Sequence, residues 1–439
     1  MYLVSSALDC EPNQNYVSLI KTSKQYADEE EVHIRGDGVA TLLFQNMLPN
    51  RVQIKEGCID KTVNDQYTLV LRDYGSDSWD EGSMVDITNE YGVTVFMGRM
   101  SATSQESIPL SLYSPITPYT QWQFSLNAPQ SDWTDVSASV VGWNEYVKGN
   151  WTTSVSGTQY FRTSVRVLTN LAAYDLRVRY LSGVIVYVNG VEVYRDNMPN
   201  GAVDINTLST NSYETLVFRG VVRSGMDLLN PTAVVAVELH FMNAASRDVT
   251  FDAVLSQLSS VSTSSNCYMM SGYTVTSSVG STENLIDMNM NTVFSTTSNS
   301  MSVSYSWSDV NVIVNEWKFG VGSDVSIAPN SFVWSGSMSS TGEMNEVGSI
   351  SMSGYQSNKY YSTTSVSSSE SYNYYSIVME SSASSIGLTG LYPMVCSQMV
   401  PSSIGYSSES YSFMRGVEPI LIVPSVSGFV NCTVNPALP

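Results

Sequence analysis

A tight-turn signature between two runs of alternating apolar residues sets the strongest limit on the fold of this chain. Residues 180–199 read YLSGVIVYVNGVEVYRDNMP. Apolar side chains alternate up to Val188 and resume at Val191, and Asn189-Gly190 stands between the two runs. Only residues that tolerate positive φ can form the primed turn that matches strand twist, so this stretch predicts a β-hairpin.

Length and composition extend this prediction to the whole chain. The 439 residues exceed one ordinary hydrophobic core, so about three domains are expected. Charged residues make up only 14% of the chain, and helical periodicity is hard to find in it. Abundant Ser, Thr, Tyr and Val favour strands. We therefore predict an all-β protein.

The excess of acidic residues limits the kinds of molecule that this chain is expected to bind. The chain has 20 basic and 40 acidic residues, a formal net charge of -20, without a Lys/Arg cluster. Nucleic acid and anionic membranes are therefore poor partners on electrostatic grounds, and we expect neither. An acidic, Ser/Thr-rich surface suits a secreted protein or one that collects divalent cations.

No apolar stretch is long enough for a membrane span, which argues against membrane insertion. Residues 1–10 lack the regions of a signal peptide, so either a leader has been removed or Met1 is not the start of the precursor.

Residues 114–258 resemble the galactose-binding-like jelly-roll module of secreted and surface proteins. The resemblance rests on four features in order: Tyr160-Phe161-Arg162, Ala172-Ala173-Tyr174, the Asn-Gly hairpin, and the strand from Ala236 to His240. It implies a β-sandwich and an extracellular location, and it implies no reaction.

Residues 1–113 are predicted to form an N-terminal β-domain. Three alternating strands surround a Gly/Asp/Ser turn near Trp79, which indicates a meander. The pattern resembles Asp/Gly/Trp repeats in large secreted proteins of protists and some bacteria. Cys10 and Cys58 are the only cysteines here, so we expect them to form a disulfide.

Four carboxylates gather on the predicted turn of this domain: Asp73, Asp77, Asp80 and Glu81. Hard cations take several oxygen ligands, so calcium is the expected cofactor if the turn binds a metal. The alternative is that these acids solvate the turn and cap strand ends, as Asp commonly does. The regular alternation of a dedicated calcium loop is missing.

Tryptophans are concentrated ahead of the jelly roll, at Trp122, Trp133, Trp143 and Trp151. Packing on the sandwich is the leading interpretation, and stacking on sugar rings is the alternative. Asn150 begins an Asn-Trp-Thr sequon for N-glycosylation.

Glu238 and His240 are expected on one face of a strand. Same-face neighbours of this kind commonly form a hydrogen-bonded pair, and we expect that role here rather than acid–base catalysis.

Residues 256–271 read as a Ser-rich linker, and residues 259–400 resemble the discoidin, or coagulation-factor C, sandwich. The matching features are the turn at 284–287, the strand Asn291-Thr-Val-Phe-Ser295, and the run from Phe332 to Ser337. This family often joins its first and last strands by a disulfide, which implies a bond between Cys267 and Cys396. The turn at Asp287 and Asn291 would either hold a cation or be capped by its own side chains.

Residues 401–439 resemble the opening strands of a cadherin-like, immunoglobulin-type repeat and then stop. Either the precursor is longer, or another subunit supplies the missing strands. Cys432, the odd cysteine, would find its partner outside these residues. Asn431 begins a second, cysteine-containing sequon.

Taken together, these features predict an extracellular or cell-surface protein with a structural or adhesive role. One form of this hypothesis is a repeating subunit of a surface filament or coat, which associates with itself or with other surface proteins. The alternative is a carbohydrate-binding, lectin-like protein that takes glycans as partners. The sequence shows no nucleophile elbow, His-rich metal site or phosphate loop, so we expect no enzymatic activity.

Overall fold

The computed structural model describes residues 8–36, 39–100, 102–146, 158–169, 171–228, 230–243, 251–260, 267–363 and 370–397, together with the backbone of 404–405 and 425–426. Strands dominate these residues, which confirms the predicted all-β class. The described helical elements are short: α1 (Glu283–Ile286), η1 (Val63–Asp65), η2 (Gly225–Leu228) and η3 (Val325–Ile327). None of the described helices is long and apolar enough to cross a membrane.

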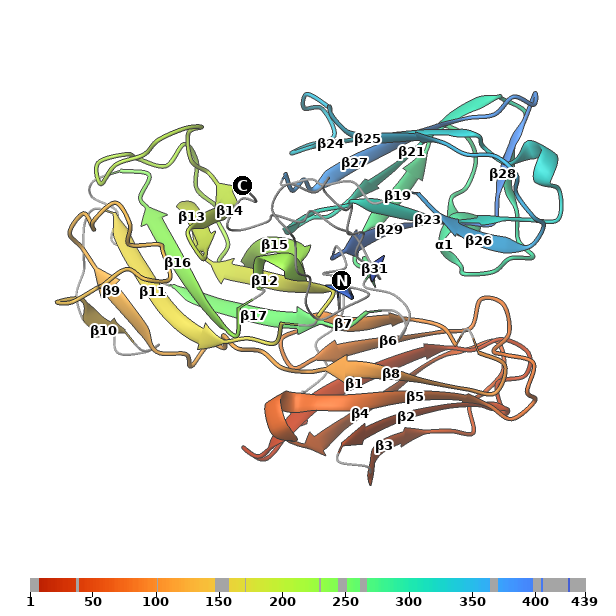
Figure 1. Cartoon of the computed structure of the whole chain (residues 1–439), viewed down its shortest axis with the longest axis horizontal. Coiled ribbons are helices and arrows are strands. Elements are labelled where there is room, and N and C mark those ends of the chain that lie inside the picture. The colour runs from red at the N-terminus through yellow and green to blue at the C-terminus, as the bar shows by residue number, and fades with distance from the viewer. Residues whose placement is uncertain are drawn as a thin grey trace, which may run out of the picture.

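The first module, which comprises the described residues of the range 1–113, is a sandwich of two four-stranded sheets, drawn in red and orange in Figure 1. One sheet has the order β4 (Val52–Asp60), β1 (Gln14–Thr22), β6 (Met84–Asn89), β7 (Thr94–Gly98). The other has the order β3 (Val39–Phe44), β2 (Glu30–Gly36), β5 (Gln66–Asp73), β8 (Gln105–Ser111). Alternate residues of β1 are buried, which places one face of that strand in the core.

The meander predicted for this module is wrong in one respect. All three expected strands form, and β6 pairs with β7, but β5 belongs to the opposite sheet. The connection between β5 and β6 is longer than a tight hairpin turn, and Trp79 within it is buried. A loop anchored in the core in this way carries the chain from one sheet to the other.

The second module, residues 114–258, contains the predicted hairpin. One sheet has the order β10 (Asn144–Tyr146), β9 (Trp122–Ser125), β11 (Gln159–Arg166), β16 (Thr232–His240), β13 (Gly183–Val188), β14 (Val191–Asp196). The facing sheet contains β17 (Asp252–Leu258), β12 (Ala173–Arg179) and β15 (Phe218–Ser224). Asn189 and Gly190 link β13 to β14 with φ values of 50° and 85°, as a primed turn requires.

The third module, which comprises the described residues of the range 259–400, is again a sandwich. One sheet has the order β18 (Cys267–Met269), β29 (Gly390–Cys396), β23 (Glu316–Val321), β26 (Lys359–Ser362). The other has the order β19 (Thr274–Ser277), β21 (Ser300–Ser306), β27 (Tyr374–Glu380), β24 (Ser331–Ser337), β25 (Asn345–Ser351). A short pair accompanies them, β20 (Phe294–Thr296) with β28 (Ile386–Leu388). Outside this range, β30 (Ile404–Gly405) pairs with β31 (Ser425–Val426). The Ser-rich segment expected to be a linker includes the end of β17 and all of β18.

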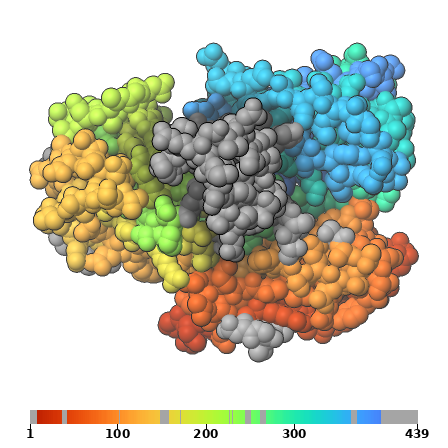
Figure 2. Space-filling view, in the orientation of Figure 1, coloured from red at the N-terminus to blue at the C-terminus, as the bar shows by residue number. Residues whose placement is uncertain are grey.

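The three modules pack against one another, and Figures 1 and 2 show the orange first module in contact with both others. Strand β22 (Val310–Val312) of the third module pairs in parallel with β15 of the second. Within the second module, Gly220 of β15 allows close approach to β12, because a Cβ there would lie 1.9 Å from the Leu176 carbonyl oxygen. Tyr268 of the third module donates a hydrogen bond of 2.7 Å to the Thr94 carbonyl of the first.

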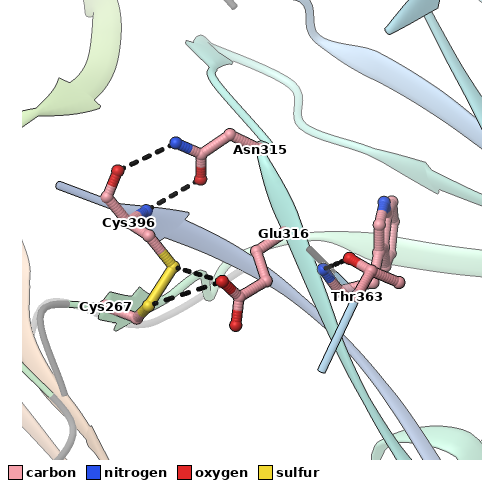
Figure 3. The surroundings of a disulfide bond; sticks show 6 residues. Cys267, Asn315, Glu316, Thr363 and Cys396 are labelled. Carbon is pink, nitrogen blue, oxygen red and sulfur yellow. Dashed lines mark hydrogen bonds between the residues drawn. A yellow bond between two sulfur atoms is a disulfide. The ribbon is translucent and has the colours of Figure 1, made fainter. Parts of the chain in front are cut away.

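The described part of the chain contains two disulfides, between Cys10 and Cys58 and between Cys267 and Cys396, as expected. The second joins directly opposed residues of β18 and β29. Figure 3 shows two hydrogen bonds between the side chain of Asn315 and the backbone of Cys396. Asn315 Nδ2 donates to the Cys396 carbonyl and Asn315 Oδ1 accepts from the Cys396 N–H, each at 2.8 Å. The Glu316 carboxylate approaches the bonded sulfurs, and its Oε2 lies 3.3 Å from Cys396 Sγ. These sulfurs are oxidised, so they are not available as thiolate metal ligands.

Candidate ligand-binding recess

A recess of about 630 Å³ lies where loops of the first module meet the outer face of a sheet of the third. The first module contributes the β5–β6 loop and residues at the end of β7 and just after it. The third contributes the loop after α1 together with β18, β23, β29 and the start of β26. Its lining is Asp77, Ser78, Trp79, Asp80, Glu81, Gly98, Arg99, Met100, Met269, Met288, Met290, Asn291, Lys318, Asn358, Tyr360 and Tyr392.

Hydrogen bonds between the two loops hold the recess together. Gly82 N–H donates to the Met288 carbonyl at 2.9 Å, and Met290 N–H donates to Glu81 Oε2 at 2.8 Å. Gly82 has a φ of 85°, which L side chains rarely adopt, and a Cβ on it would lie 3.2 Å from the Asp287 carbonyl oxygen of the third module. Glycine therefore suits this position, where the two loops meet.

Two cations with different surroundings line the recess. Arg99 forms an ion pair of 2.6 Å with Glu81 and donates a hydrogen bond of 2.7 Å to the Trp79 carbonyl. Lys318 places its ammonium 5.0 Å from the centre of the Tyr360 ring. Burial lowers the pKa of Lys318, and the nearby Arg99 charge lowers it further.

Tyr360 contributes a partly buried ring and a hydroxyl to the recess. Burial raises the pKa of Tyr360 to about 12, with the negative charge of Glu81 acting in the same direction. The phenol therefore stays neutral at physiological pH and can donate a hydrogen bond. Asn291 and Asn358 are exposed at the recess, and each amide offers both donors and an acceptor.

The four carboxylates predicted as a calcium site do not act as one group. Asp73 and Asp77 come together with Glu29, so that ligand oxygens of all three lie within 4.8 Å of one another. Asp73 Oδ2 also accepts hydrogen bonds from the backbone of Asp77 and Ser78, at 3.0 and 3.2 Å. This is the turn capping that was the alternative interpretation.

The other two acids are engaged elsewhere. Asp80 Oδ2 accepts a hydrogen bond of 2.8 Å from Tyr26 N–H, and Glu81 pairs with Arg99 in the recess. Burial and the charges of Asp73 and Asp77 raise the pKa of Glu29. Calcium binding at this turn stays a prediction for Asp73 and Asp77, and Glu29, which was not named from the sequence, adds a third carboxylate beside them.

The turn around Asp287 is capped by its own neighbours. Its carboxylate accepts hydrogen bonds from Asn289 N–H at 3.0 Å and from Thr292 Oγ1 at 2.7 Å. Asn291 instead lines the recess.

The described tryptophans of the second module pack mainly against other rings. Trp122 is buried edge-on against Phe251, with ring centres 4.9 Å apart. Trp133 is buried against Tyr160, and the half-exposed Trp143 lies 5.7 Å from Trp133. Core packing therefore accounts for Trp122 and Trp133.

Glu238 and His240 form the expected same-face pair. His240 Nε2 lies 3.1 Å from Glu238 Oε2, and Tyr187 donates a hydrogen bond of 2.8 Å to Glu238 Oε1. His240 Nδ1 lies 2.8 Å from the Thr207 carbonyl oxygen. The pair is buried and satisfied within the second module, consistent with a structural role.

Several predicted residues lie outside the part of the chain that the structure describes. They are Cys432, the sequon asparagines Asn150 and Asn431, and Trp151.

Four residues that supply positive charge and hydrogen-bonding groups to the recess were not identified from the sequence, namely Arg99, Lys318, Asn358 and Tyr360. Lys318 lies on β23 between the inward-facing Trp317 and Phe319, so alternation alone indicates that its side chain points outward. Nothing local signals that another module covers this outer face. Glu29 had a weak signal, the acidic run 28–31.

Together the fold and the recess define an all-β, disulfide-linked protein of three packed sandwiches with a polar recess between the first and third. No family model matches the chain, and no curated protein matches it.

Among solved structures, the CBM32 of AlyQ in complex with 4,5-unsaturated mannuronic acid is 23% identical, with 27% of this chain and 92% of that chain covered and a TM-score of 0.24. The F5/8 type C domain of a Bacteroides fragilis protein is 10% identical, with coverages of 28% and 91% and a TM-score of 0.25. A fucolectin from striped bass (Morone saxatilis) serum is 12% identical, with coverages of 55% and 83% and a TM-score of 0.26. At these TM-scores the likenesses support no statement about function.

Proposed function

We propose that this chain is an extracellular carbohydrate-binding protein and that the recess between its first and third modules holds the saccharide. The recess carries the proposal, because its volume of about 630 Å³ lies within the range of roughly 300–1,000 Å³ typical of small-molecule sites. The two disulfides of the described chain support a location in an oxidising, extracellular compartment.

The chemistry of the lining suits a sugar. A pyranose presents hydroxyl groups around its rim and C–H groups on its faces. The amides of Asn291 and Asn358 supply donors and acceptors for hydroxyl groups. The thioethers of Met100, Met288 and Met290 supply apolar surface that adapts its shape.

A structural or adhesive role as a filament or coat subunit, with self-association, stays a prediction. Glycan binding is compatible with adhesion at a cell surface.

The test is a glycan array with the purified full chain, followed by calorimetric titration of the strongest ligand. We expect saturable binding that Asn291→Trp weakens at least about tenfold, equivalent to about 1.4 kcal/mol, because the indole fills the mouth of the recess. Ser340→Trp is the matched control, since Ser340 is exposed on the β24–β25 connection of the other sheet. Absence of saturable binding to any glycan, or equal affinities of Asn291→Trp and the control, would contradict the proposal.

A further inference from the structure

Lys318 is the cation of the recess that lacks a matching anion. Its ammonium contacts the Tyr360 ring, and among the described residues it forms no ion pair or hydrogen bond. Glu106 and Glu316 act on it only at longer range. A partly buried charge that is left without a partner is unusual, since buried charges in proteins are normally paired.

The other enclosed cations of this region show the contrast. Arg99 is paired with Glu81, and the fully buried Lys21 is paired with Glu30. Arg99 Nε nevertheless remains buried without a hydrogen-bond partner among the described residues. The recess therefore offers one uncompensated ammonium, that of Lys318.

The remaining charges limit what an anionic ligand can be. Asp77, Asp80 and Glu81 also line the recess, and the chain carries a formal net charge of -20. A multiply charged phosphate or a densely sulfated polymer would be repelled by these carboxylates. A single carboxylate would match the single unpaired ammonium.

We propose that the recess selects an acidic saccharide of the uronic-acid type, whose carboxylate pairs with Lys318 while its hydroxyl groups bond to Asn291 and Asn358. This inference rests on the proposed carbohydrate-binding function and adds the class of sugar. A charge-assisted hydrogen bond in a recess is stronger than a neutral one, so the carboxylate contributes selectivity over the neutral sugar.

The experiment compares oligogalacturonate and oligomannuronate with oligogalactose and oligomannose of equal length, by calorimetric titration of the full chain at low salt. We expect one acidic oligosaccharide to bind roughly 10- to 100-fold more tightly than its neutral counterpart, the gain typical of hydrogen bonds to charged groups. Lys318→Met keeps the apolar stem and should remove that gain, while Lys318→Arg should retain most of it.

Lys359→Met is the matched control, because Lys359 is an exposed lysine on the neighbouring strand that bonds to Gln356 and does not line the recess. Equal losses in Lys359→Met and Lys318→Met would assign the effect to general electrostatics and overturn the inference. Acidic and neutral sugars of equal affinity would also overturn it and leave the proposed function intact. Absence of binding to either class, with arrays equally silent, would instead contradict the proposed function.

Thermal unfolding of each variant shows whether it folds. If Lys318→Met does not fold, Asn291→Trp replaces it, because this variant blocks the recess without altering Lys318. Acidic-sugar affinity unchanged in Asn291→Trp would overturn the inference.

Discussion

Glu30→Gln is expected to lower the free energy of unfolding by about 3–5 kcal/mol, the cost of leaving one member of a buried ion pair without its partner. Lys21 and Glu30 form this pair inside the first module, with side chains 0% and 1% exposed. Burial lowers the pKa of Lys21, and Glu30 is the leading influence that opposes this shift. In Glu30→Gln the buried ammonium of Lys21 therefore loses the negative charge that stabilises it.

This pair also bears on the recess. Lys21 Nζ lies 4.1 Å from the centre of the Trp79 ring, and Trp79 is one of the recess residues. Urea unfolding at pH 7 measures the effect. The double variant Lys21→Met/Glu30→Leu is the control, since replacing both partners by apolar residues is often neutral or stabilising. A loss below about 1 kcal/mol in Glu30→Gln would contradict this account of the core.

Asp86→Asn is expected to raise the free energy of unfolding at pH 8 by up to about 3 kcal/mol, from 1.36 kcal/mol per pKa unit. Burial raises the pKa of Asp86 to about 6, and its Oδ1 is buried without a hydrogen-bond partner among the described residues. Burial is the main cause of the raised pKa of Tyr268, and the Asp86 charge adds to it across the contact between the first and third modules.

The raised pKa of Asp86 determines how the free energy of unfolding changes with pH. Between about pH 4 and pH 6 the folded state binds more protons at Asp86 than the unfolded state, so stability falls as the pH rises through this window. It then stays low above pH 6. Asp86→Asn should remove this part of the slope, measured by urea unfolding at several pH values. Asp28→Asn, at an exposed aspartate, is the control. An unchanged slope in Asp86→Asn would show that another group is responsible.

Local features of the fold could be predicted from the sequence, because the conformational preferences and polarity of neighbouring residues determine them. The turn at Asn189-Gly190 needs residues that tolerate positive φ, and period-two alternation marks the inward faces of strands such as β1 and β23. The disulfide between Cys267 and Cys396 followed from a family resemblance and is present in the structure.

Contacts between modules could not be predicted in this way. Strand β22 has only three residues, and its pairing with β15 depends on how two folded modules meet. Glu81 and Met290 are 209 positions apart, yet the hydrogen bond between them closes one side of the recess. The acidic turn was recognised, but its grouping with Glu29 depends on the approach of a separate loop.

Hydrogen–deuterium exchange of the full chain, with and without a saturating saccharide chosen by the array, tests the central claim most directly. If the recess holds the sugar, protection will increase together in peptides covering residues 77–81, 98–100, 288–291 and 358–360, which line it from two modules. Protection confined to the second module, around Trp133 and Trp143, with these four segments unchanged, would contradict the account.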